Sequence, residues 1–272
     1  GVLREEETID YDAVLATARE FKPALIVTGA TAYPRIIDFA KFREIADEVD
    51  ALLMVDMAHI AGLIAGGAHP SPAPYADIIT STTHKTLRGP RGAIILSRRS
   101  LARKINSAVF PNMQGGPMVH AIAAKAVAFG EAATPEFRTY AAAVVANAQA
   151  LAATLANGGL RIVSGGTDTH LMLVDVSTRD ITGQEAEDAL RAAGIIANKN
   201  AIPFDPLPPR VTSGVRLGTP ALTSRGMDTG DMDTVAGFIL EALDSAGNDG
   251  AAASIRRRVL DFASKFPVPG IN

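Results

Sequence analysis

The first half of the chain alternates amphipathic stretches with short apolar runs. Residues 10–21 repeat apolar side chains at helical spacing, which predicts a helix, and residues 24–27 predict a strand that closes at Gly29. Asp38 is a candidate N-cap of a second helix, whose apolar face extends to Val49. Further apolar runs predict three more strands, at residues 51–55, 78–79 and 93–96.

Uninterrupted apolar strands between helices are typical of a sheet that is buried on both faces. The pattern therefore predicts an α/β layer architecture with mostly parallel strand pairing, and it leaves room for one antiparallel strand. No internal repeat interrupts the alternation.

The amino-acid composition changes near the middle of the chain. A glycine-rich loop covers residues 111–117, and an alanine-rich pattern then predicts a helix at residues 118–132. A longer helix is expected to start at the threonine-proline pair 134–135 and to stop at the glycine-containing turn 157–159.

The start of that long helix is the predicted domain boundary. It separates a large domain over residues 1–133 from a smaller C-terminal α/β domain over residues 134–272. The smaller domain is expected to hold strands at residues 160–163 and 171–174, a helix from a capping box at 182–185 to near Gly194, and helices at 232–243 and 254–262. Residues 247–253 are predicted to form a loop between the last two helices.

Composition narrows the classes of function. The chain has 272 residues, enough to bury a sizeable core in one or two domains. Its 26 basic and 29 acidic residues give a net charge of −3 without a basic block, which argues against a nucleic-acid partner or an anionic membrane surface. The absence of cysteine excludes disulfides and cysteine-bound zinc and suits a reducing cytoplasm. No apolar run seen in the sequence approaches the roughly 20 residues of a membrane span, so we expect a soluble, cytoplasmic protein acting on a small molecule.

Two polar segments follow directly on predicted strands. Asp56 comes after the strand at residues 51–55, and residues 80–86 pack five hydroxyl groups, an imidazole and the amine of Lys85 after the next strand. In α/β folds, ligands bind at the carboxyl ends of the strands. A partly buried lysine there can act as a nucleophile toward a carbonyl. For Asp56 taken alone, a cap on the following turn is an equally good interpretation.

An acid and a lysine on adjacent strand ends match the needs of pyridoxal phosphate, whose aldehyde takes an amine and whose ring nitrogen takes a carboxylate. Such a pair is common by chance, so a phosphate cradle and a carboxylate clamp are also needed. Gly115 and Gly116 offer backbone N–H groups without Cβ obstruction, although a plain tight turn also explains them. Arg216, in a strand-like segment, can grip a carboxylate with two hydrogen bonds, although an ordinary ion pair also explains it.

Five segments resemble the serine hydroxymethyltransferase family of fold-type I pyridoxal-phosphate enzymes. They occur in family order over essentially the whole chain: VDMAHIAGLIA, STTHKTLRGPRG, INSAVFPNMQGGP, VSGGTDTHL and VTSGVRLGTPALTSRG. The threonine-rich run before His84 and Lys85 separates this family from ordinary aminotransferases. The resemblance implies a fold-type I α/β transferase, with part of a mostly parallel-sheet large domain followed by the smaller domain.

The resemblance also implies roles for residues around the cofactor. Lys85 would form the Schiff base with pyridoxal phosphate, Asp56 would pair with the pyridine nitrogen, and His59 would lie near the phenolic oxygen. Thr82 and His84 would tune the site beside the lysine and help to steer the reaction.

More distant contacts are implied in the same way. Thr31 occupies a position where the family usually has serine near the cofactor, so the hydroxyl group is kept. Arg216 would bind the α-carboxylate of the amino acid, and Asn200 would touch the folate. The glycines 115–116 would reach the phosphate of a neighbouring subunit's cofactor, and Arg91 would support the site at the subunit contact.

The sequence departs from the family pattern in three places. Phe204 replaces a usual asparagine, and residues 112–113 vary the glycine loop. The family's chain normally begins well before Gly1, and roughly its first third would contain the ring-stacking histidine, a phosphate-binding turn, and the tyrosine and glutamate that act on the hydroxymethyl group. No remaining histidine is assigned to stacking, and His69 and His120 are expected at the surface or behind the site.

The function implied by the resemblance is reversible transfer of serine's hydroxymethyl carbon to tetrahydrofolate, yielding glycine and 5,10-methylenetetrahydrofolate for one-carbon metabolism. Two alternatives stay open: a catalytically incompetent fragment that serves as a fold or partner-binding module, and a related threonine aldolase with the same lysine and aspartate. A metal site from Asp56, His59 and His84 is disfavoured by the adjacent lysine and the glycine loop, so no metal is expected. Because the family completes each site across an interface, we expect a homodimer or higher homo-oligomer.

Overall fold

The structure is a computed structural model that describes residues 1–271, and these residues form two compact units. The first unit consists of Gly1, Ile9–Thr31 and Ile36–Ala141, and the second of Val2–Thr8, Ala32–Arg35 and the described residues from Ala142 on. The chain passes between units inside helix α6 (Pro135–Asn157). The domain boundary between residues 133 and 134 stays a prediction.

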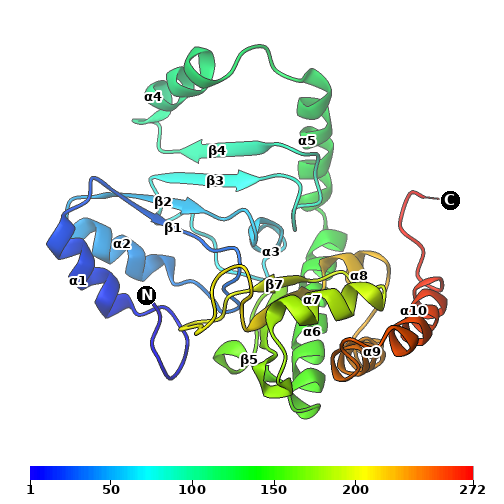
Figure 1. The fold of residues 1–272 in the computed structure, drawn as a ribbon. Coiled ribbons are helices and arrows are strands. Elements are labelled where there is room, and N and C mark those ends of the chain that lie inside the picture. The colour runs from blue at the N-terminus through cyan, green and yellow to red at the C-terminus, as the bar shows by residue number, and fades with distance from the viewer. Residues whose placement is uncertain (272) are drawn as a thin grey trace. The chain divides into compact units, whose positions relative to one another are not determined.

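The first unit holds a mixed sheet whose strands are β1 (Leu25–Thr28), β2 (Leu52–Asp56), β3 (Ile78–Thr82) and β4 (Ala93–Ser97). They lie in that order, with β1, β2 and β3 parallel and β4 antiparallel to β3 (Figure 1). The helical segments are α1 (Tyr11–Phe21), α2 (Phe39–Glu48), α3 (Ala61–Ala65), α4 (Ala102–Ser107), the π-helical turn η1 (Ala108–Met113) and α5 (Val119–Ala132). The predicted α/β architecture with mostly parallel strands is confirmed.

Two aspartates begin the helices that flank β1 in the sequence. Asp10 Oδ1 accepts a hydrogen bond from Ala13 N at 2.9 Å, and Asp38 Oδ1 accepts one from Lys41 N at 3.1 Å. The cap predicted at Asp38 is confirmed. These bonds satisfy backbone N–H groups that the first turn of a helix leaves unpaired.

The two faces of the sheet differ in exposure. On one face Leu53 and Val55 are fully buried and Ile79 is 7% exposed, although Leu96 on the edge strand β4 is 50% exposed. On the other face Val27 is 60% and Ile95 45% exposed. The prediction of a sheet buried on both faces is therefore wrong for the described residues. An apolar strand pattern indicates that side chains avoid water, but it does not say which segment covers them.

The second unit contains an antiparallel sheet in the order β5 (Arg161–Ile162), β6 (Leu171–Asp175), β8 (Gly214–Gly218) and β7 (Asn198–Asn200). Its helical segments are η2 (Val163–Gly165), η3 (Ser177–Arg179), α7 (Gly183–Ala192), α8 (Pro220–Ser224), α9 (Met232–Asp244) and α10 (Asp249–Ala263). The capping box predicted before α7 is confirmed, because Thr182 and Glu185 each bond the other's backbone N–H.

One local prediction in this unit is wrong, and one strand was not predicted. Helix α10 begins at Asp249, so most of the predicted loop at residues 247–253 is helical. The reason is that Asn248 Oδ1 caps the helix by accepting from Ala251 N at 3.1 Å, and alanine favours helix over loop. Strand β7 was missed because its Asn-Lys-Asn sequence carries no apolar alternation.

Helix α6 is long and apolar enough to cross a membrane by length and composition, and it alone passes that test among the described residues. Its polar residues break the apolar sequence into short runs, so the sequence pattern does not single it out. Val144, Ala148, Leu151 and Leu155 are at most 1% exposed, and the last three belong to the core of the second unit. The apolar residues on this face of α6 therefore serve the interior of the protein.

Asp77, immediately before β3, joins three segments of the first unit. Its carboxylate accepts from Arg43 Nη1 at 2.8 Å, Arg98 Nε at 2.8 Å and Leu53 N at 2.9 Å. Burial alone would raise the pKa of Asp77, but the hydrogen bonds from Leu53 and Arg43 outweigh it and hold the pKa below its ordinary value.

We expect Asp77→Asn to lower the free energy of unfolding at pH 7 by about 2 kcal/mol, because it removes charge-assisted hydrogen bonds at a mostly buried group. The unfolded chain takes up the proton at higher pH than the folded chain. The native carboxylate's contribution is therefore complete above the ordinary aspartate pKa and is lost as the pH falls through the lower folded pKa. Urea unfolding at several pH values measures this. A wild-type advantage that persists at the acid end of the series would contradict the assignment.

Candidate active site

The predicted acid lies at the carboxyl end of β2. Asp56 is the last residue of that strand, is exposed, and pairs in register with Thr80 of β3. Its Oδ1 accepts a hydrogen bond from Ala58 N at 3.0 Å, so the carboxylate caps the following turn. Among the described residues, Oδ2 accepts no hydrogen bond. Asp56 can therefore both cap the turn and bind a ligand, since Oδ1 bonds the turn and no described residue donates to Oδ2.

Lys85 lies in a tight loop that follows β3 and is half-buried. Thr83 closes the loop: its N donates to Gly92 O at 2.9 Å, its Oγ1 donates to Pro90 O at 2.6 Å, and its carbonyl accepts from Gly89 N at 2.7 Å. A Cβ at position 89 would lie 2.7 Å from that carbonyl oxygen, so only glycine permits the closure. The backbone that carries the lysine is thus fixed on both sides.

Thr86 locks this loop to the one that follows β2. Its Oγ1 donates to the carbonyl of His59 at 2.8 Å and accepts from Gly62 N at 3.0 Å. The two backbones approach so closely that a Cβ on Gly62 would lie 2.1 Å from the Thr86 carbonyl oxygen. Thr86 carries no predicted role. Its only sequence signal is a hydroxyl beside the lysine, and its partners are known only once the strands are paired.

Three buried polar atoms at the end of β3 have no hydrogen-bond partner among the described residues: Thr80 Oγ1, Thr82 Oγ1 and His84 Nδ1. Thr80 and Thr82 project from the same face of the sheet as Asp56, because strand side chains alternate. Buried polar groups in proteins are nearly always paired. Three unpaired ones beside a half-buried lysine are what a polar ligand would satisfy.

The side chain of Arg91 contacts His84, with Nη1 3.2 Å from Nε2. A guanidinium group has no acceptor atom, so Nε2 of the histidine must supply the lone pair. The imidazole is therefore neutral in this contact and carries its proton on Nδ1. That N–H donor is a buried atom for which no described residue supplies an acceptor, so the contact with Arg91 leaves His84 with a donor to offer a ligand.

The structure places the other predicted residues of the first unit differently. Gly29, at φ +139°, brings the loop after β1 so close to β2 that a Cβ there would lie 2.1 Å from Asp56 O, and the exposed Thr31 follows in the same loop. Gly115 and Gly116 are exposed, and a Cβ on either would meet nothing within 4 Å. No described residue packs closely against these two glycines.

Two predicted substrate residues belong to the second unit. Arg216 lies in the middle of β8 and is paired in register with Asn198, while Asn200, at the end of β7, pairs with Gly214. Burial lowers the pKa of the Arg216 guanidinium below its ordinary value. A guanidinium already partly removed from water gives up little hydration when it binds a carboxylate.

The remaining histidines behave differently from one another. His69 is 5% exposed, with Nδ1 2.9 Å from the carbonyl of Pro70 and its ring centroid 5.9 Å from that of Phe39. The expected surface alternative is therefore wrong for His69. His120 is exposed, as one of the two expected positions has it.

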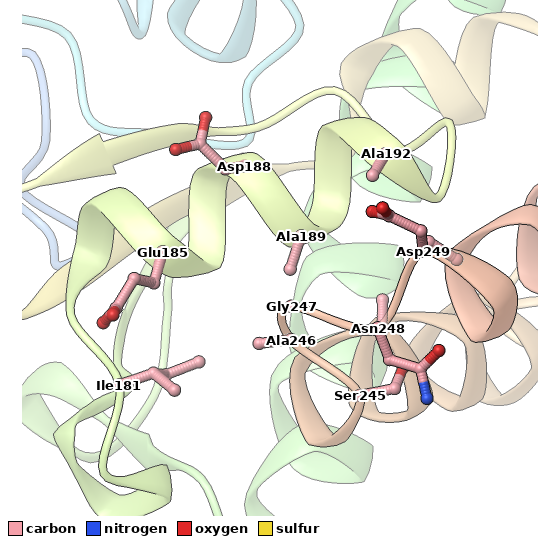
Figure 2. Close-up of a pocket in the computed structure, with 12 residues that line it drawn as sticks. Ile181, Glu185, Asp188, Ala189, Ala192, Ser245, Ala246, Gly247, Asn248 and Asp249 are labelled. Atoms are coloured by element: carbon pink, nitrogen blue, oxygen red, sulfur yellow. The ribbon is translucent and has the colours of Figure 1, made fainter.

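A cavity of about 340 Å³ in the second unit contains none of the predicted site residues. It lies between α7 and the turn that joins α9 to α10, where Figure 2 shows Glu185 and Asp188 on α7. The carboxylate of Glu185 accepts from the N and Oγ1 of Thr182, and these bonds lower its pKa. Asp188 bonds Gln184 and Arg191. Both acids thus support the helix.

A family model described as serine hydroxymethyltransferase matches residues 1–239. Serine hydroxymethyltransferase of Myxococcus xanthus is 59% identical over 268 residues, which cover 98% of this chain and 64% of that protein. Serine hydroxymethyltransferase 2 of Rhodospirillum rubrum is 57% identical over 276 residues (99% and 64%), and the Acidiphilium cryptum enzyme is 58% identical over 275 (98% and 64%). The chain thus spans about 64% of the length of these curated relatives.

The contact between Arg91 and His84 leads to a spectroscopic prediction. Long-range ¹H–¹⁵N correlation of the imidazole nitrogens should show His84 with its proton on Nδ1, and Arg91→Ala should abolish this fixed tautomer, because the donor to Nε2 is gone. His84→Gln identifies the signal. Arg88→Ala is the matched control, since that guanidinium stacks on Tyr140 at 4.6 Å. Protonation of wild-type His84 on Nε2 would refute the assignment.

Proposed function

The chain belongs to the serine hydroxymethyltransferase family, and from this premise we propose that it carries the lysine-bearing part of a pyridoxal-phosphate-dependent serine hydroxymethyltransferase. The reaction converts serine and tetrahydrofolate to glycine, 5,10-methylenetetrahydrofolate and water, and it is reversible. The observation that carries the proposal is the half-buried Lys85 beside three unpaired buried polar atoms, in a segment that the family model matches.

The residues present fit pyridoxal phosphate. The group offers an aldehyde, a phenolic oxygen and a ring nitrogen. The first unit supplies an amine, buried donors and, at the carboxyl edge of its sheet, a carboxylate oxygen that no described residue bonds. Lys85 would hold the cofactor through Nζ, and Asp56 would hold a proton at the ring nitrogen. His59 would lie beside the phenolic oxygen, with its backbone anchored by Thr86.

When bound, the protonated ring draws electrons from the α-carbon of the amino acid, which is the chemistry that breaking the Cα–Cβ bond of serine needs. Arg216 would bind the α-carboxylate with two parallel hydrogen bonds and so fix the orientation of the amino acid. The Nδ1–H of His84 and the hydroxyl of Thr82 would donate to polar atoms of the bound molecules. Thr31 would add a hydroxyl from the loop after β1.

We assign folate contact to Asn200. Its Nδ2 donates to the carbonyl of Ala201 at 2.8 Å, which holds the amide at the end of β7. Phe204, where the family usually has asparagine, lies under the guanidinium of Arg4 at 4.2 Å. The substitution replaces an amide with an aromatic face, so polar contact with folate would fall to Asn200. We also propose a cytoplasmic location and a role in serine and glycine metabolism.

A non-catalytic module is the alternative to be tested. It is considered because the chain spans about 64% of its relatives' length, and the relatives' names do not favour it. Serine cleavage that depends on tetrahydrofolate separates the enzyme from this module. The same dependence separates it from a threonine aldolase, a function that the relatives' names do not favour.

A labelling experiment tests the role of Lys85. The chain is incubated with pyridoxal phosphate, reduced with borohydride and digested, and mass spectrometry locates the added mass. We expect it on the peptide that contains Lys85, with a loss of about tenfold or more in labelling for Lys85→Arg, because the guanidinium does not condense with the aldehyde. Lys125→Arg, at another partly buried lysine of this unit, should label normally. Unchanged labelling of Lys85→Arg would refute the assignment.

The proposed partner is a second copy of the chain, placed by an exposed apolar surface. The surface is formed by η1, α5 and the loop between them, and its members are Phe110, Met113, Met118, Val119, Ile122 and Val127, all at least 51% exposed. Of the α5 residues, Ala128 and Ala132 are buried. Exposed apolar side chains that gather on successive elements are candidates for an interaction site. Gly115 and Gly116 lie within this surface, which suits their proposed reach to a neighbour's phosphate.

Charge on this surface should weaken the dimer. Val119→Asp combined with Ile122→Asp is expected to raise the dissociation constant by about 30-fold or more, since two carboxylates would be buried without partners. Light scattering over a dilution series measures the change. Leu260→Asp, at a 56% exposed leucine of α10, is the control. A dissociation constant that the double variant leaves unaltered would contradict this placement of the interface.

A further inference from the structure

The connection between β7 and β8, residues 201–213, is closed around the single carboxylate of Asp205. Oδ1 accepts from Leu207 N at 2.9 Å and from Ser213 Oγ at 2.7 Å. Oδ2 accepts from Ile202 N at 3.1 Å and from Ser213 N at 2.8 Å. The carboxylate therefore bonds both ends of the connection: Ile202 lies two residues after the end of β7, and Ser213 directly precedes β8.

The charge of Asp205 is held in place by these donors. Burial alone would raise the pKa of Asp205, but the hydrogen bonds from Ser213, Leu207 and Ile202 outweigh it and lower the pKa. A carboxylate with two donors on each oxygen has no spare acceptor for a ligand. Asp205 thus serves the local structure and does not contact substrate.

The connection needs such a clamp because its backbone is strained. Phe204 and Thr212 both adopt left-handed conformations, at φ +56° and φ +59°, which side-chain-bearing residues avoid. Strained residues persist only where the surroundings over-determine them. Asp205 follows the first of these residues directly, and its partner Ser213 follows the second.

Ser213 transmits the clamp to β8. It is 2% exposed, and its carbonyl accepts from Val176 N at 3.0 Å, which continues the pairing of β6 with β8 past Gly214. The packing at Gly214 leaves no room for a side chain, because a Cβ there would lie 2.6 Å from Ile202 Cγ2 and 2.9 Å from Asn200 O. The register of β8, and with it the place of Arg216 opposite Asn198, begins at this junction.

We propose that Asp205 is a positioning residue for amino-acid binding: by clamping the β7–β8 connection it fixes Arg216 and Asn200 on one ribbon in the geometry that binds the substrate. This inference rests on the function proposed for Arg216. The clamp acts on binding, because Arg216 would hold the substrate's carboxylate both before and during the reaction. Loss of such an interaction raises KM with little change in kcat.

The test measures KM for serine and kcat in the holoenzyme that contains this chain. We expect Asp205→Asn to raise KM by about tenfold with kcat changed less than about twofold, because the amide keeps a single acceptor oxygen. Ser213→Ala, which removes one of the four bonds, should raise KM by about threefold and covers the case in which the first variant does not fold. Asp228→Asn is the control, since Asp228 accepts from Gly230 N in a loop before α9.

A double-mutant cycle separates positioning from general destabilisation. If Asp205 acts through Arg216, Asp205→Asn raises KM in the wild-type background but not in Arg216→Ala. Equal effects in both backgrounds, or an unchanged KM in both clamp variants, would overturn the proposal. The Arg216 Nε–H resonance gives an independent readout and should shift in Asp205→Asn. If that resonance shifts but Arg216→Ala leaves KM unchanged, the clamp stands and the function proposed for Arg216 fails.

Discussion

The hydroxyl group of Thr86 is the interaction on which the candidate site depends. It bonds the carbonyl of His59 and the amide of Gly62, and so holds together the two loops that leave β2 and β3. Parallel pairing alone brings the strand ends to one edge, but it leaves the loops beyond them free to diverge. With the lock in place, Asp56 and Lys85 leave the sheet from neighbouring strands into loops of defined relative position.

Part of the site could be predicted from residue type and order, and part could not. Asp56 and Lys85 were found because a carboxylate and an amine after apolar strands are unusual, and the family motifs then supplied roles for their neighbours. The tautomer of His84 could not be predicted from the sequence, because it depends on a contact with Arg91 that forms only when the loop folds. The same holds for Thr80, whose importance lies in a buried oxygen without a partner. The sequence identifies the polar side chains, but only the fold shows which of their atoms are buried without a hydrogen-bond partner among the described residues.

The fold shows the same division. Side-chain caps are local, so Asp38 and the Thr182–Glu185 box could be identified from a few neighbouring residues. Strand β7 could not, because Asn198–Asn200 is held by pairing with β8 and not by apolar burial. The exposed face around Val27 shows a further limit. Local pattern records that a side chain is apolar, whereas burial depends on segments far away along the chain or on another molecule.

That same sheet has a practical consequence. Strands β1 and β4 are its two edges, and they carry exposed apolar side chains, Val27 on β1 and Ile95 on β4. Edge strands with unpaired backbone N–H and C=O groups, combined with exposed apolar side chains, allow proteins to aggregate edge to edge in concentrated solution. Low protein concentration, which makes encounters between exposed edges rarer, and low ionic strength, which weakens salting-out, are the conditions that keep the chain dispersed.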